Sequence, residues 1–190
     1  MMKEWEVVGS KYLLKEKYLT VRSDHVRMPS GHEISDFYVI EYPNWINVIA
    51  ITAEGLFIIE KQYRNGIRAI NYEICAGMID EGETPIEAAR RELLEETGYG
   101  GGKWVEFCIT TPNPSSMNNY NYTFLAVGVT KVAKVRAEES EEIEVELLTL
   151  EQVKQLLLDG KITEGIMQAP LWRYIYENKE RPVEWKSTET

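Results

Sequence analysis

The sequence predicts an α+β fold in which antiparallel strands are followed by one helix, more strands and two closing helices. Three observations support this order. Short apolar runs are separated by turn residues, one central segment carries complete helix start and stop signals, and two segments near the C-terminus have helical periodicity. The chain of 190 residues is long enough for one ordinary domain, with or without a small appendage.

The first strands are expected before the central helix. Residues 5–42 alternate loosely and contain the turn sequence PSG, which indicates an antiparallel sheet that Pro43 ends. The runs INVIAIT and LFIIEKQYR flank a turn at Ala53 to Gly55 and predict a hairpin of largely buried strands. The run INYEICAGM predicts one further strand.

The central helix is expected over residues 84–97. Thr84 can be its N-cap, Pro85 sits at the first helical position, Glu87 completes a capping box, and Gly98 stops the helix.

Strands and two helices complete the chain. The runs WVEFCIT, YTFLAVGVTKV and IEVELLTL predict strands, and LEQVKQLLLDG predicts a helix. A last amphipathic helix is expected from Ala169 to Glu180.

Charge and histidine content exclude several classes of function. A formal net charge of −10 argues against binding a nucleic-acid backbone, although a small nucleotide can still bind at a locally cationic or metal-containing site. His25 and His32 are too few for histidine-based catalysis or a multi-histidine metal site. No apolar run approaches membrane-spanning length and no leader is evident, so we expect a cytoplasmic protein without a membrane partner.

Carboxylates gather on the central helix. On a helical wheel at about 100° per residue, Glu92, Glu95 and Glu96 share an arc that borders the apolar stripe. One interpretation is a solvated acidic face. The other is a site for Mg²⁺ or Mn²⁺, because converging carboxylates repel one another and hard cations prefer oxygen ligands.

The segment around this helix resembles the Nudix box. Gly77, Glu83 and the run Arg91 to Tyr99 (RELLEETGY) have the spacing of that motif, with Tyr99 where the family more often has an aliphatic residue. The resemblance implies an α/β/α sandwich around a mixed sheet. It also implies hydrolysis of a nucleoside diphosphate linked to another moiety, with divalent cations held by the box.

The resemblance extends to the ADP-ribose pyrophosphatase branch of that family. EYPNWINVIAIT, GLFIIEKQYR and YEICAGMIDEGE are similar to this branch. It implies an N-terminal dimerisation sheet at 1–42, a hydrolase domain at 43–190 and a homodimer. The implied reaction converts ADP-ribose, or a related nucleoside diphosphate sugar, into AMP and a sugar phosphate with Mg²⁺ or Mn²⁺. Another nucleotide sugar such as GDP-mannose, or a nucleotide-binding module without hydrolysis, are the alternatives.

The resemblance also implies roles for individual residues. Metal would be held by the carbonyl of Ala76 and the carboxylates of Glu92, Glu95 and Glu96, with Arg91 orienting a glutamate. The implied substrate contacts are Arg64, Glu73, Met78 and Pro114. The implied catalytic base lies in the acidic loop AEESEE, as Glu139 or else Glu141, although such a run can also be a solvated turn.

Several further residues have two interpretations each. Asn119 stands where the family often has glutamate, and an amide cannot be an anionic ligand. Asparagines 118, 119 and 121 can contact a base or a sugar, or only shape a turn. Trp45 and Tyr63 can stack on a base or belong to the core. Lys61, Arg64 and Arg68 can contact phosphate or pair at the surface with Glu60 or Glu54.

Overall fold

The computed structural model describes residues 2–16, 19–136 and 142–178. Contacts divide the chain into two compact units. The first unit is Met1–Pro43 with Thr111–Tyr120, and the second unit is Asn44–Thr110 with Asn121–Thr190.

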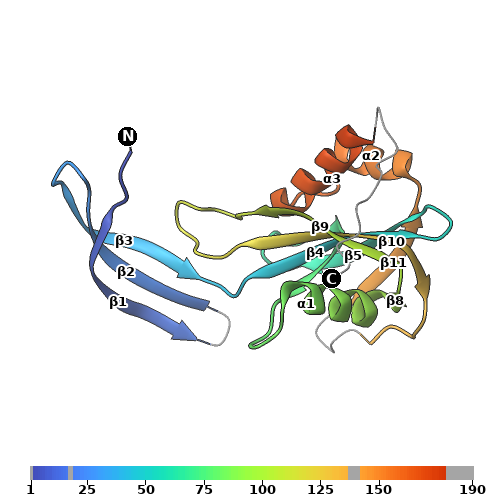
Figure 1. Cartoon of the computed structure of the whole chain (residues 1–190), viewed down its shortest axis with the longest axis horizontal. Coiled ribbons are helices and arrows are strands. Elements are labelled where there is room, and N and C mark those ends of the chain that lie inside the picture. Colours follow the sequence, from blue (N-terminus) through green and yellow to red (C-terminus); the bar gives the residue numbers. More distant parts are fainter. Residues whose placement is uncertain (1, 17–18, 137–141, 179–190) are drawn as a thin grey trace. The chain divides into compact units, whose positions relative to one another are not determined.

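The first unit is a small antiparallel sheet. Its strands are β1 (Glu6–Glu16), β2 (Leu19–Arg27) and β3 (Glu33–Glu41), in the order β1-β2-β3 (Figure 1). The segment 111–120 adds to this unit, because the Ile40 amide donates to the Ser116 carbonyl at 2.7 Å. The predicted antiparallel strands of 5–42 are therefore confirmed.

The second unit is built on a mixed sheet of eight strands, in which β4 and β10 pair in parallel and the other pairs are antiparallel. The sheet order is β11-β5-β4-β10-β8, with β6 on β5, β7 on β4 and β9 on β10. The strands are β4 (Trp45–Thr52), β5 (Phe57–Arg64), β6 (Ala69–Glu73), β7 (Cys75–Met78), β8 (Tyr99–Gly100), β9 (Lys103–Thr110), β10 (Asn121–Lys131) and β11 (Ile143–Leu148).

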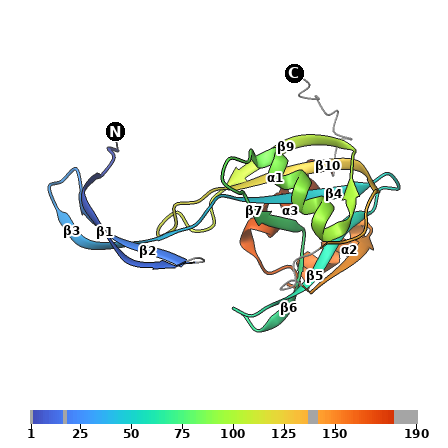
Figure 2. The ribbon, with the colours of Figure 1, turned by 90° about the horizontal axis from the view of Figure 1, so that it is seen from below.

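Helices cover both faces of this sheet. Helix α1 (Pro85–Glu92) continues as a π-helical segment (Leu93–Thr97) on one face, and α2 (Leu150–Leu158) and α3 (Gly165–Glu177) lie on the other (Figure 1). Figure 2 views the unit from the α1 side, where α1 crosses β4 and β10. The predicted α+β class and the α/β/α layering are confirmed. None of the helices in the described ranges is long and apolar enough to cross a bilayer.

The alternation of β4 divides the interior into two apolar clusters. Val48 faces α1 and packs with Leu93 in one cluster, whereas Ile49 packs with Val153 and Leu171 in the other. Successive residues of a strand point to opposite faces, so one continuous apolar strand can serve both layers. The central strand, with which β7 pairs, is thereby held on both sides.

Two expected elements differ from the structure. The run INYEICAGM was expected to form one strand, but it breaks at Ile74 into β6, which pairs with β5, and β7, which pairs with β4. Apolar character alone does not show which neighbour each half chooses.

The last helix begins at Gly165 and ends at Glu177, so the expected bounds Ala169 to Glu180 are wrong. Pro170 lies inside the helix and cannot donate to the carbonyl of Ile166. The side-chain amide of Asn47 donates to that carbonyl at 2.9 Å instead. A residue distant in sequence thus compensates for the missing helical bond.

Candidate active site

The helix that carries the acids is fixed at both ends by local interactions. Thr84 is its N-cap, and the Glu87 carboxylate accepts hydrogen bonds from the Thr84 amide at 2.9 Å and from its hydroxyl at 2.5 Å. These bonds lower the pKa of Glu87. Gly98 ends the segment in the left-handed conformation, with φ of 69°, a conformation that favours glycine. The predicted start and stop signals are confirmed.

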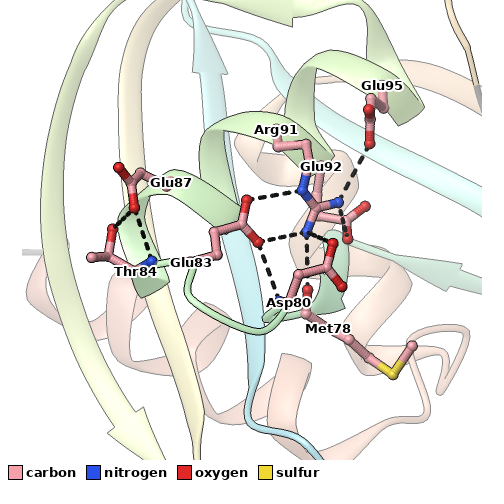
Figure 3. A network of polar contacts seen from close by, with 8 residues as sticks. All are labelled: Met78, Asp80, Glu83, Thr84, Glu87, Arg91, Glu92 and Glu95. Carbon is pink, nitrogen blue, oxygen red and sulfur yellow. Dashed lines mark hydrogen bonds and ion pairs between the residues drawn. The ribbon is translucent and has the colours of Figure 1, made fainter.

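Arg91 joins the loop, the strand before it and the helix (Figure 3). Its guanidinium donates two parallel bonds to Glu83, each of 2.9 Å, and one bond to Glu92 of 2.8 Å. It also reaches the Met78 carbonyl at 3.1 Å and Glu95 at 3.4 Å. The bonds from Arg91 lower the pKa of Glu83. A bidentate pair of this kind fixes orientation as well as distance, so Glu92 is held in place from the side.

Gly77 is needed because Glu92 lies directly over it. A methyl group on Gly77 would overlap with the side-chain carboxylate of Glu92. The carboxylate therefore rests against the backbone of β7, beside the carbonyl-bearing residues Ala76 and Gly77. This arrangement fits a divalent cation, because carboxylate and carbonyl oxygens are the ligands of hard cations such as Mg²⁺ and Mn²⁺.

The three acids of the helix do not share one environment. Glu96 is 5% exposed, Glu92 is half-buried and Glu95 is exposed. Ligand atoms of Glu96, Glu60 and Cys75 lie within 4.8 Å of one another in the interior. Burial, together with the charges of Glu96 and Glu60, raises the pKa of the Cys75 thiol well above its usual range. The thiol therefore stays protonated beside two buried carboxylates.

A pocket of about 810 Å³ opens beside these acids, within the second unit. Its charged lining consists of three arginines and five carboxylates, so acids outnumber bases: Arg64, Arg91, Arg136, Asp80, Glu92, Glu95, Glu96 and Glu164. A diphosphate entering such a pocket would be repelled unless cations were bound with it. Pocket size and charge together therefore suit a phosphate-bearing molecule that arrives with divalent metal.

Most of the residues singled out in the sequence line this pocket. The predicted residues among its lining are Ala76, Met78, Arg64, Arg91, Glu92, Glu95 and Glu96, and Trp45 and Asn121 also line it. The buried Glu73 and Pro114, which belongs to the first unit, do not line the pocket. Glu139 and Glu141 lie outside the described residues.

Two of the cations before the box, Lys61 and Arg64, are paired with acids. Arg64 donates to the buried carboxylate of Glu73 through two bonds of 2.8 and 2.5 Å, and Lys61 pairs with Glu144 at 2.9 Å. Neither partner is Glu54 or Glu60, the acids expected from the sequence. Arg64 is nevertheless one of the pocket-lining residues, so its Glu73 partner holds it in a fixed orientation there.

Sequence reasoning missed Arg136, Asn71, Thr163 and Glu164, which also line the pocket. Burial, and secondly the charge of Glu73, raises the pKa of Glu164, whereas Arg64 opposes this shift. No motif marks these positions. The one available signal was that Glu164 directly precedes an apolar helical segment, but the expected start of that helix was placed too late to show it.

Fold and site together define a class of protein. A mixed sheet between helices carries a loop and helix whose carboxylates converge beside a large pocket, as in hydrolases that act on phosphate anhydrides with divalent metal. The chain belongs to the Nudix family. The NUDIX domain model matches residues 41–168, and the model of the nucleoside diphosphate sugar hydrolase N-terminal domain matches residues 5–40. It is a Nudix hydrolase, of a family that generally requires a divalent metal.

Similar proteins agree with this assignment. The chain is 30% identical to the ADP-ribose pyrophosphatase of Bacillus subtilis over 155 residues, which cover 81% of this chain and 83% of that protein. It is 26% identical to the ADP-ribose pyrophosphatase of Mycobacterium tuberculosis over 165 residues, covering 86% and 79%. A crystal structure of an ADP compounds hydrolase shares the fold, with a TM-score of 0.82, 20% identity, and coverage of 96% and 99%.

Proposed function

We propose that this protein hydrolyses the diphosphate bond of a nucleoside diphosphate sugar, with ADP-ribose as the first candidate and Mg²⁺ or Mn²⁺ as the metal. The observation that carries the proposal is the convergence of Glu92, Glu95 and Glu96 beside a pocket large enough for a nucleotide. The relatives named ADP-ribose pyrophosphatase support the choice of substrate. The products would be AMP and ribose phosphate.

Different residues would hold the metal, position its ligands and contact the substrate. Glu92, Glu95, Glu96 and the Ala76 carbonyl would hold divalent metal, which offsets phosphate charge and lowers the pKa of a water. Arg91 would keep Glu92 in place through the contacts described above. Arg64, fixed by Glu73, would contact the substrate together with Met78.

Hydrolysis also requires a group that accepts a proton. A water oxygen would bond to one phosphorus while the bridging phosphorus–oxygen bond breaks, and the proton of the water would pass to a carboxylate. Glu139 or Glu141 in the loop after β10 stays the predicted base.

We also propose that the protein is a cytoplasmic homodimer that associates through the segment 1–42. Strand β1 is an edge strand of 11 residues whose side chains are all exposed, and they include Tyr12, Leu13 and Leu14. An exposed apolar edge strand is suited to pairing with another chain. The same segment matches the N-terminal domain model of the nucleoside diphosphate sugar hydrolases.

The direct test is release of AMP from ADP-ribose with Mg²⁺ by the wild type and by Glu96→Gln. We expect the variant to lose about 10²- to 10³-fold in kcat/KM, because an amide is a poor ligand for a hard cation. Glu54→Gln, in the exposed turn between β4 and β5, is the matched control and should keep full activity. Equal rates for wild type and Glu96→Gln would refute the metal-helix mechanism.

A panel of substrates separates the alternatives. Faster release of a nucleotide from GDP-mannose than from ADP-ribose would identify another nucleotide sugar as the substrate. Tight binding of ADP-ribose that survives EDTA, without any turnover, would instead indicate a binding module.

A further inference from the structure

Glu164 occupies an unusual position at the start of α3. It is the N-cap residue, yet its carboxylate makes no capping bond to the helix. The side chain is half-buried and lines the pocket. Within residues 2–16, 19–136 and 142–178 the carboxylate has no hydrogen bond or ion pair. The charge of Glu73 repels it and the charge of Arg64 attracts it. A half-buried acid without a local partner is costly to keep, which points to a ligand.

The backbone beside Glu164 is held firmly. The Asn71 side-chain oxygen accepts from the amide and from the hydroxyl of Thr163, at 3.2 and 3.0 Å. The Asn71 amide group donates to Glu73 at 3.2 Å, and the Tyr72 amide donates to the Lys161 carbonyl at 3.2 Å. Strand β6 therefore positions the backbone directly before Glu164.

Asn121 supplies a second acceptor to the same pocket. It is 0% exposed, begins β10 opposite Trp45, and lines the pocket together with Trp45. Its amide group donates weakly to Thr123 at 3.4 Å. Its side-chain oxygen is buried and has no hydrogen-bond partner among the described residues. Buried acceptors are normally satisfied, so this oxygen lacks a donor, which a ligand seated against the pocket wall would supply.

We propose that Glu164 and Asn121 form a sugar-binding side of the pocket, which accepts hydrogen bonds from vicinal hydroxyl groups of the substrate. The two oxygens of a carboxylate can accept hydrogen bonds from both hydroxyls of a diol. The ionised Glu164 carboxylate and the Asn121 side-chain oxygen are both acceptors, so they match hydroxyl donors. Phosphate offers no matching donors when ionised. Because Arg64 is already neutralised by Glu73, Glu164 leaves this corner negative and it would reject an additional phosphate.

This inference rests on the proposed function and names the part of the substrate that the site selects. It assigns Glu164 to specificity and not to the bond-breaking step. The diol can belong to the terminal sugar or to the nucleoside ribose, and the choice of substrates below distinguishes these sources.

The experiment compares wild type and Glu164→Ala on ADP-ribose and on the β-methyl ester of ADP, which lacks the terminal sugar. We expect kcat/KM on ADP-ribose to fall about 10- to 10²-fold, as for loss of a hydrogen bond to a charged group, with the methyl ester changed less than about threefold. An analogue of ADP-ribose that contains 2′,3′-dideoxyadenosine lacks the diol of the nucleoside ribose and therefore tests that source. If the variant loses rate on the ester but not on this analogue, the diol is that of the nucleoside.

Equal losses on all three compounds would overturn the inference, since the effect would then not depend on a diol. Asn121→Ala provides the second variant, with thermal melting as the check of its fold. If the wild type releases no AMP from any compound, the proposed function fails. Calorimetric binding of the same three compounds with Mg²⁺ then decides the inference, because Glu164→Ala should weaken only the binding of compounds that carry the recognised diol.

Discussion

The two units of the chain differ sharply in how much interior they have. Among the described residues, the apolar side chains buried in the first unit are Val26 and Val39, beside the buried polar residues Ser23, Asp24 and Asn119. The second unit contains two apolar clusters on opposite faces of its sheet. A strand-rich segment with so small an interior gains little stability from its own packing.

This difference leads us to expect that catalysis depends on the second unit and association on the first. In the second unit, packed strands and helices hold Glu92 and Arg91 in fixed positions. In the first unit, apolar side chains stay at the surface of β1. Changes near the pocket should therefore affect catalysis through sub-ångström geometry, whereas changes on β1 should affect association.

Replacing a glycine with alanine should lower activity in the second unit and leave it unchanged in the first. Gly77→Ala places a methyl group where the Glu92 carboxylate lies, so it should displace that carboxylate and lower kcat/KM by about 10²-fold or more. Gly9→Ala in β1 meets no atom within 4 Å and should leave activity unchanged. The measurement is AMP release at saturating Mg²⁺. An active Gly77→Ala protein would show that Glu92 need not lie against β7.

A milder change should test how Arg91 holds the acids. Arg91→Lys keeps the charge but loses the fork that binds Glu83 through two bonds. We expect a 10- to 100-fold loss, of the size seen for residues that orient metal ligands, together with a higher Mg²⁺ concentration for half-maximal rate. Arg90→Lys, on the same helix beside Trp104, is the matched control. A loss of rate with unchanged metal dependence would contradict the positioning role.

Much of the fold could be predicted because local signals agree with it. Thr84, Glu87 and Gly98 set the ends of the acidic helix through bonds between near neighbours. The last helix was misplaced for the opposite reason. Pro170 leaves the Ile166 carbonyl without its helical hydrogen bond, and the side chain of Asn47, which is distant in sequence, donates to that carbonyl instead. No local pattern contains that information.

The site residues also fall into those that local sequence predicts and those that it does not. The residues of the loop and helix are close in sequence, so one motif brings Gly77, Glu92 and Glu96 into view together. Glu164 and Arg136 reach the pocket only through the folding of the sheet. The predicted arc of three similar acids was too simple, because Glu96 is buried whereas Glu95 is exposed. The π-helical turn that carries them departs from the regular wheel on which that arc was drawn.

Association should depend on β1 and not on apolar exposure in general. Leu13→Glu places charge on the exposed edge strand and should convert a dimer into a monomer of 22.0 kDa in light scattering. Leu158→Glu, at an exposed apolar position of α2, should leave the dimer intact. If the wild type is a monomer, or if both variants dissociate, β1 is not the specific interface. Circular dichroism should be unchanged in each variant.

The smallest effect should appear in stability as a function of pH. Burial raises the pKa of Glu164, so the folded state binds its proton more tightly than the unfolded state does. Stability is therefore lost as pH rises from near 4 through the folded pKa, and the cost is fully present above it. Glu164→Gln should raise Tm at neutral pH by about 1–3 °C in EDTA, and this gain should vanish near pH 4.

Glu83→Gln should give the opposite sign. Bonds from Arg91 lower the pKa of Glu83, so its contribution is present above the pKa of the unfolded state and is lost as pH falls through the folded value. This variant should be less stable than wild type at neutral pH, with a difference that shrinks in acid.

Melting curves in EDTA at several pH values measure both variants. A Glu164→Gln protein that is less stable than wild type at neutral pH would show that the carboxylate is held by the fold, and would remove the reason to expect a ligand there.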